Sequence, residues 1–261
     1  MSWRSWFALP LMLVSFAAVV TIQRDRLTQL QTAAAEPTLA EFEADLEQER
    51  LRLELWRSLP TFGFDNLFAD WVLLQFFQYF GDEEARKLTG YELTLDYYEI
   101  VLQHNPRFVE IYPFLATSGA IYAVDPQRTD KLMTQGIAQM TPEVPHHAYT
   151  ALQNKAVNEL LFLPDGGSRA QVTFEQAAEW ASVYDDDLSK TAADFATGMS
   201  QTLALNPDSR LVRVGAWNVI LQSARDEQTQ ILAITQIRAL GGDVIETEDG
   251  RLVPTFPPDA E

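Results

Sequence analysis

Cysteine is absent from the 261 residues of the chain. This absence excludes disulfide bonds, thiolate catalysis and the zinc or iron–sulfur sites that depend on cysteine. Glycine and proline, with 12 and 13 residues, are too few for a collagen-like or low-complexity chain. Apolar residues make up 47% of the sequence and charged residues 21%, which indicates a folded body that buries one large core.

Basic residues are also scarce: 19 Lys and Arg stand against 37 Asp and Glu, and the formal net charge is −18. The first 22 residues hold one arginine and no acidic residue, so residues 23–261 carry −19. Such an acidic surface repels phosphate backbones and anionic lipid headgroups, and we expect no nucleic-acid binding. It favours a protein partner whose contact surface is basic or neutral.

Charged residues are missing from one long stretch near the N-terminus, residues 6–22, and no later uncharged run is as long. As a helix, these 17 residues span about 25 Å, and a start at Trp3 extends the helix to bilayer thickness. The sequence therefore predicts a single-pass transmembrane anchor over residues 1–26. A cleaved signal peptide is the alternative, but the small-residue triplet at 33–35 lies too far behind the charges at 24–26 for a typical cleavage region. The absence of cysteine favours an extracytoplasmic body.

From Pro37 onward the sequence predicts helices almost throughout. Thr38 and Glu41 form a capping box at the first of them. An apolar stripe with helical spacing follows the box: Leu39, Phe42, Leu46, Leu53 and Trp56. The stripe predicts one amphipathic helix, since five positions are few for the alternative, a coiled-coil stalk.

Residues 66–80 are unusual because they are apolar on every face of a helix. Such a helix lies in a protein core or in lipid, and its short length favours the core over a re-entrant membrane contact. A carboxylate there needs a hydrogen-bond donor or stays protonated. Asp70 is therefore predicted to bind a neighbouring helix or, alternatively, the basic group of a partner. Phe68, Trp71, Leu74 and Phe77 are predicted core residues, and the aromatic candidates for structural landmarks or interaction residues are Trp71, Tyr79, Tyr112, Trp180 and Trp217.

Helix pairs of similar size indicate a tetratricopeptide-like repeat of about 34 residues. Asn105-Pro106 and Asn206-Pro207 lie 101 residues apart, close to three such units. Ala170, Phe174 and Ala177 have the small–aromatic–small spacing of the second helix of a repeat. The matches to the full pattern are partial, so an irregular helical bundle is the alternative.

Two stretches of the sequence resemble a bacterial family of membrane-anchored, tetratricopeptide-like proteins. The first is residues 59–71 (LPTFGFDNLFADW) with residues 78–81 (QYFG), and the second is residues 105–108 (NPRF) followed by Tyr112. The resemblance extends over roughly residues 59–240. It implies a helical-repeat architecture and a membrane location, and it implies no reaction.

Motifs for catalysis are lacking: there is no Gly-x-Ser-x-Gly elbow, no Rossmann fingerprint and no complete phosphate loop. Glu143 and His146 have the spacing of ligands in di-iron bundles, but Pro142 and Pro145 interrupt the helix that such ligands need. The aspartates at 185–187 are interpreted as a helix cap rather than a cation site. We predict no catalytic residue, no cofactor and no metal site.

The predicted fold class is all-α: a transmembrane helix, an α-solenoid of tetratricopeptide-like hairpins and a short C-terminal β-hairpin. The predicted boundaries are 1–26 for the anchor, 27–60 for a linker and the amphipathic helix, 61–243 for the repeat domain, and 244–261 for the hairpin and an acidic tail. The expected function is a membrane-tethered scaffold or adaptor that binds a protein partner, for example during assembly of a membrane complex. The alternative is an all-α enzyme, which a pocket of converging carboxylates or histidines would favour.

Overall fold

The computed structural model describes residues 16, 19–21, 23–24, 38–224, 226–247 and 252–255. Most of the predicted transmembrane anchor lies outside these described residues, as do the turn of the predicted β-hairpin and the acidic tail. Among the helices that the described residues form, none is long and apolar enough to span a membrane. The chain divides into two units, Met1–Glu49 and Arg50–Glu261.

The first unit includes the start of helix α2 (Leu39–Ser58), which ends in the second unit. The predicted capping box is confirmed: the backbone N of Thr38 donates to Glu41 Oε2 at 2.7 Å, and Glu41 N donates to Thr38 Oγ1 at 3.4 Å. These hydrogen bonds lower the pKa of the Glu41 carboxyl. Of the predicted apolar stripe, Leu39 at the start of α2 is 48% exposed, whereas Leu53 and Trp56 near its end are buried.

The second unit consists of successive helices and a C-terminal pair of strands. The helices after α2 are α3 (Asp65–Gly81), α4 (Glu83–Thr89), α5 (Thr94–His104), η1 (Val109–Ile111), α6 (Tyr112–Thr117), η2 (Ser118–Tyr122), α7 (Pro126–Ile137), α8 (Tyr149–Phe162), α9 (Gly166–Ala181), α10 (Asp187–Leu205), α11 (Arg210–Ser223) and α12 (Glu227–Ala239). Strands β1 (Asp243–Glu246) and β2 (Leu252–Thr255) pair antiparallel, with Ile245 opposite Val253. The predicted all-α class with a C-terminal β-hairpin is thus confirmed.

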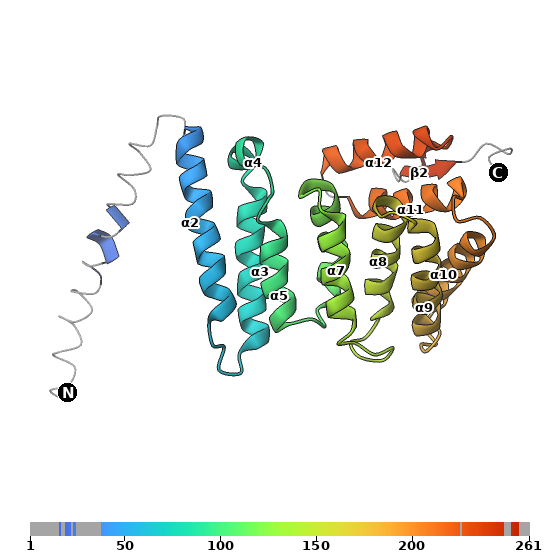
Figure 1. The fold of residues 1–261 in the computed structure, drawn as a ribbon, viewed down its shortest axis with the longest axis horizontal. Helices are drawn as coiled ribbons and strands as arrows, with labels where there is room; N and C mark the ends of the chain where they lie inside the picture. Colours follow the sequence, from blue (N-terminus) through green and yellow to red (C-terminus); the bar gives the residue numbers. More distant parts are fainter. Residues whose placement is uncertain are drawn as a thin grey trace, which may run out of the picture. The chain divides into compact units, whose positions relative to one another are not determined.

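Helices that follow one another in the chain also pack against one another. α3 packs on α5, α5 on α7, α7 on α8, α8 on α9 and α9 on α10, and Figure 1 shows the upright helices α3, α5, α7, α8 and α9 in this order. α11 and α12 run crosswise to these helices (Figure 1), and α11 packs on both α8 and α12. The core between them is rich in fully buried aromatic side chains: Phe76, Tyr97, Tyr98, Tyr112, Tyr149 and Phe174.

Short-range signals set several helix boundaries where the sequence predicted them. Among the three consecutive aspartates, Asp186 caps α10, because its Oδ1 accepts a hydrogen bond from Ser189 N at 2.9 Å.

Gly167, in the first turn of α9, allows a close approach between backbones. A Cβ at this position would lie 1.9 Å from the carbonyl oxygen of Pro207, so only glycine lets α9 pack on the connection between α10 and α11.

Helix α3 corrects the expectation of a helix buried on all sides. Its buried residues form one stripe, Ala69, Val72, Leu73, Phe76 and Tyr79. The predicted core residues Trp71, Leu74 and Phe77 are 40%, 59% and 43% exposed, and Phe68 is half-buried. Asp70 is exposed as well, so its carboxylate meets water and needs no partner from another helix. The reason is geometric: within the described chain, α3 packs mainly on α5, and one neighbouring helix covers one face.

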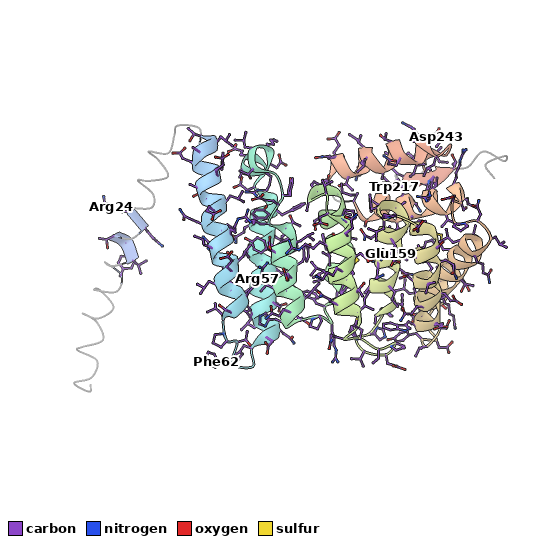
Figure 2. The ribbon with its side chains drawn as sticks, in the orientation of Figure 1. Arg24, Arg57, Phe62, Glu159, Trp217 and Asp243 are labelled. Carbon is purple, nitrogen blue, oxygen red and sulfur yellow. The ribbon has the colours of Figure 1, made fainter. Side chains whose placement is uncertain are left out.

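The turn between α2 and α3, together with the first turn of α3, holds apolar side chains in solvent: Leu59, Phe62, Phe64 and Leu67. We call this segment the apolar turn. Phe62 is 86% exposed and lies at the outer tip of this turn (Figure 2). Its φ of +51° is in the left-handed region, which costs a residue with a side chain of this size about 1 kcal/mol or more. Gly63 follows at φ +88°. The chain therefore adopts a strained backbone that presents a phenylalanine to solvent.

Four charged side chains form an ion network where α7, α8 and α9 meet, and we call them the buried ion network. Asp130, Lys155 and Glu159 are largely buried, whereas Arg169 is 44% exposed at the edge of the network. Asp130 Oδ2 lies 2.7 Å from Arg169 Nη2, and Asp130 Oδ1 lies 3.2 Å from Lys155 Nζ. Lys155 also pairs with Glu159, whose side chain is 3% exposed and lies among the helices in Figure 2. Thr173 Oγ1 donates to Glu159 Oε2 at 2.6 Å. Two negative and two positive charges make the network neutral, which low-dielectric burial requires.

Candidate functional site

The six residues that the sequence singled out are spread over four helices, α3, α6, α9 and α11, and do not form one site. Asp70 and Trp71 are exposed on α3, and the Trp71 ring packs edge-on against Trp56 at 4.4 Å. Tyr79 and Tyr112 are buried: the hydroxyl of Tyr79 accepts from Leu93 N, and that of Tyr112 donates to the Pro106 carbonyl. The remaining two are Trp180, half-buried on α9, and Trp217, buried on α11 (Figure 2).

An apolar cavity of about 360 Å³ opens between α3, the α6–η2 segment and the connection from α11 to α12. We call it the aromatic cavity. α3 contributes three rings, α6 and η2 contribute two more, and Asp226 stands at its polar end. These lining residues are Phe76, Phe77, Phe80, Phe114, Tyr122 and Asp226.

The aromatic cavity has a buried floor and an exposed rim. Phe76 is 1% exposed, and its ring centroid lies 4.7 Å from that of the fully buried Tyr98. Phe77 and Phe114 are 43% and 46% exposed and meet edge-to-face with centroids 6.0 Å apart. An apolar group that passes the rim rings and reaches the aromatic floor would therefore lose its contact with water.

A π-helical segment, η2, positions Tyr122 at the cavity. Ala123 N donates to the Ser118 carbonyl at 2.9 Å, five residues back, and such widened turns are frequent at functional sites. The hydroxyl of Tyr122 donates to Asp226 Oδ1 at 2.6 Å, and Thr229 Oγ1 lies 2.9 Å from the same hydroxyl. Burial and the Asp226 carboxylate both raise the pKa of Tyr122, so the hydroxyl remains protonated at neutral pH.

The carboxyl of Asp226 stays ionised although it lies against this cavity. Partial burial works to raise its pKa, but the hydrogen bonds that it accepts from Tyr122 and Thr229 outweigh burial, and the net shift is downward. Thr229 N donates to Asp226 Oδ1 at 2.7 Å, which makes Asp226 the N-cap of α12. The polar end of the aromatic cavity is therefore negatively charged at neutral pH.

A second cavity, of about 560 Å³, adjoins the first, and we call it the polar cavity. The two share Phe80, Tyr122 and Asp226. The rings of Phe80, Tyr91 and Tyr122 form one cluster with centroid separations of 4.8 to 5.0 Å. The charged residues that line the polar cavity are Glu83, Arg86, Lys87, Asp226 and Glu227.

The basic groups of the polar cavity are already engaged. The Arg86 guanidinium lies 3.9 Å from the centroid of the Tyr79 ring, and its Nη1 donates to the Gly90 carbonyl at 3.1 Å. Lys87 Nζ pairs with Glu83 at 3.4 Å. Within the described part of the chain, neither Asp226 nor Glu227 has a basic partner. The uncompensated charge in this cavity is thus negative.

Two other polar clusters bear on the enzyme alternative. Ser189 Oγ donates to Asp186 Oδ2 at 2.7 Å, and His147 Nε2 lies 3.8 Å from the same oxygen. The Asp186 carboxylate therefore separates the Ser189 hydroxyl from the His147 imidazole. A nucleophilic serine would need a direct hydrogen bond to the histidine that acts as its base. The other cluster is the buried ion network, and neither cluster lines the aromatic or the polar cavity. Among the described residues, no three His, Asp or Glu side chains gather as a metal-binding group.

Sequence reasoning missed both cavities because it assigned the rings of α3 to the core. One signal was present: Phe76 and Phe77 are adjacent, and neighbouring side chains on a helix point about 100° apart, so the two rings are not expected to be equally buried. The pairing of Tyr122 with Asp226 left no local signal, since 104 residues separate them.

Comparison of the chain with protein-family models found no match, and comparisons with curated proteins and with solved structures found no significant match either. The function proposed for these cavities accordingly depends on their own geometry and charge.

Proposed function

We propose that the protein is a membrane-tethered helical-repeat scaffold that holds a protein partner in the aromatic cavity and assists the assembly of a membrane complex. The observation that carries this proposal is the rim of the cavity, where Phe77 and Phe114 stand half in solvent above an apolar floor. Exposed aromatic rings around a concave apolar site mark interaction surfaces. The apolar turn is a second exposed surface of the same kind on this unit.

A tetratricopeptide-like solenoid is the architecture that we propose for the helices. Its support is the packing of successive helices on one another from α3 to α10. The predicted small–aromatic–small set agrees with it, because Ala170, Phe174 and Ala177 are fully buried on α9, between α8 and α10. Small residues allow paired helices to approach, and the aromatic ring fills the space between them.

The tether is proposed from the uncharged run at residues 6–22. We expect the full-length protein to stay in the membrane pellet during carbonate extraction, because a spanning helix is not released by high pH. A chain that lacks residues 1–37 should appear in the supernatant. Recovery of a native chain that begins at residue 36 would show a removed signal peptide instead, and the tether would be withdrawn.

Site-specific photocrosslinking in living cells tests the partner site. With a benzoyl-phenylalanine in place of Phe114, the full-length chain is expected to form a covalent adduct with one or a few proteins, because the probe stands at the cavity rim. The adducts are measured by gel shift and mass spectrometry after ultraviolet irradiation.

Phe195 provides the matched control for this experiment. It is also a partly exposed phenylalanine, at 36%, but it lies on α10 and lines neither the aromatic nor the polar cavity. The proposal requires adducts at position 114 that are missing at position 195. Equal labelling at both positions, or lipid adducts alone at position 114, would contradict a protein partner in this cavity.

A further inference from the structure

We infer that the aromatic and polar cavities together recognise a partner segment in which a large apolar side chain stands close to an arginine or lysine. This inference rests on the proposed function, because it names the kind of partner that the same site selects. Three features carry it: the joined geometry of the two cavities, the aromatic surfaces between them, and the carboxylates that have no basic partner among the described residues.

The joined geometry allows one ligand to reach both cavities. Phe80, Tyr122 and Asp226 line both, so an apolar group in the first cavity and a polar group in the second lie on either side of the same three side chains. Side chains two positions apart on an extended segment, or three to four apart on a helix, lie on the same face and can enter adjoining cavities. A single short segment of a protein therefore fills both cavities.

The aromatic surfaces favour a cation in the second cavity. Phe80, Tyr91 and Tyr122 line the polar cavity as one ring cluster, and the faces of aromatic rings attract guanidinium and ammonium groups. The same protein already uses this interaction nearby, where Arg86 lies over the ring of Tyr79. An arginine of the partner can stack on the cluster while its planar donors reach a carboxylate.

The carboxylates set the sign of the ligand charge. Asp226 and Glu227 face the polar cavity without a basic partner in the described chain, while Arg86 and Lys87 are occupied within their own segment. Arg86 contributes one positive charge and the N-terminus of α12 about half of one, and the two carboxylates together exceed this sum. The charge of −19 over residues 23–261 attracts basic segments from a distance as well.

Selection from a library of short random peptides displayed on phage tests the inference. The full chain is held in phosphatidylcholine nanodiscs, and bound phage are sequenced. We expect the enriched peptides to share a large apolar residue within four positions of an arginine or lysine. The best peptide is then synthesised with a fluorophore, and its affinity and association rate are measured by fluorescence anisotropy across a salt series.

The test variant combines Asp226→Asn with Glu227→Gln, and asparagine keeps the N-cap of α12. We expect this variant to bind the peptide about five- to thirtyfold more weakly and to lose most of the salt dependence of association, as two partly exposed ion pairs predict. Asp186→Asn with Asp187→Asn is the matched control, because these residues also occupy the N-cap and first position of a helix but line neither cavity. The control should bind as the unaltered chain does. Glu227→Gln alone, at an exposed position, gives a variant whose folding is not in question.

Each other outcome has a definite meaning. Enriched peptides that are apolar but carry no basic residue would overturn the inference and leave the proposed scaffold function intact. Equal weakening in the test and control variants would also overturn it, since the effect would then be one of net charge. If no peptide is enriched while dodecyltrimethylammonium binds, the site takes a cationic amphiphile, and both the inference and the protein-partner proposal fail.

Discussion

Replacement of Glu159 with alanine is expected to lower the free energy of unfolding by about 3–5 kcal/mol. Glu159 is 3% exposed and pairs with Lys155, whose side chain is 12% exposed. Without this carboxylate, the buried ion network keeps one acid, Asp130, against two bases, and Thr173 loses its acceptor. Lys155 then shares the single carboxylate of Asp130 with Arg169, and the excess positive charge is poorly hydrated, so the penalty falls on the folded state. Urea denaturation of the full chain in detergent micelles, followed by tryptophan fluorescence, measures the change.

Glu179→Ala is the control for this experiment, because Glu179 is an exposed glutamate on α9 and its loss should change stability by less than about 0.5 kcal/mol. A loss below about 1 kcal/mol for Glu159→Ala would mean that the network does not hold α7, α8 and α9 together. A simultaneous exchange of all four charged residues for apolar ones of similar size is expected to be far less harmful than the single change, since no unpaired charge then remains.

Phe76→Ala is expected to lower the free energy of unfolding by about 3–5 kcal/mol, and Phe77→Ala by only about 1 kcal/mol. Phe76 is 1% exposed and packs among the rings of Phe80, Tyr97 and Tyr98, so its removal leaves a cavity in the core. Phe77 is 43% exposed, so water already contacts its ring and fills the space that its removal leaves at the cavity rim. The urea denaturation described for Glu159→Ala measures both changes in the free energy of unfolding.

The two variants distinguish an α3 that is packed on two faces from an α3 that is packed on one face. Similar losses at both positions would show that α3 is packed on two faces, as its composition alone predicts, and the exposed rim of the aromatic cavity would then be wrong. The structure instead predicts that Phe77→Ala leaves the fold in place and weakens crosslinking from position 114, because Phe77 and Phe114 form the rim together.

Features with short-range causes could be predicted from the sequence. The capping box of Thr38 and Glu41 and the cap at Asp186 depend on residues within one turn of helix, and the structure confirms both. The hairpin of β1 and β2 follows from the apolar pairs on either side of a turn signal. Such features need no knowledge of what surrounds the helix.

Features that depend on distant neighbours could not be predicted. The sequence of α3 shows that the helix is apolar all round, but only the position of α5 decides that Phe76 is buried and Phe77 exposed. Residues 109–122 are divided into η1, α6 and η2, and the sequence gives no sign of the π turn that places Tyr122. The same holds for the buried ion network, whose members come from three helices.

The hydrogen bond between Tyr122 and Asp226 has a consequence for the time at which the protein becomes competent to bind. One wall of the aromatic cavity is formed by Ser223, Ala224 and Asp226, and Asp226 follows Tyr122 by 104 residues in the chain. At ribosomal speeds of about 5–20 residues per second, the nascent chain exposes Phe77 and Phe114 for roughly 5–20 s before that wall is synthesised. During translation the site is thus an open apolar surface without its carboxylate. Only the finished polypeptide offers a partner both the apolar cavity and the negative charge beside it. A truncated chain lacks the negative charge, and a partner that requires both therefore binds the complete chain alone.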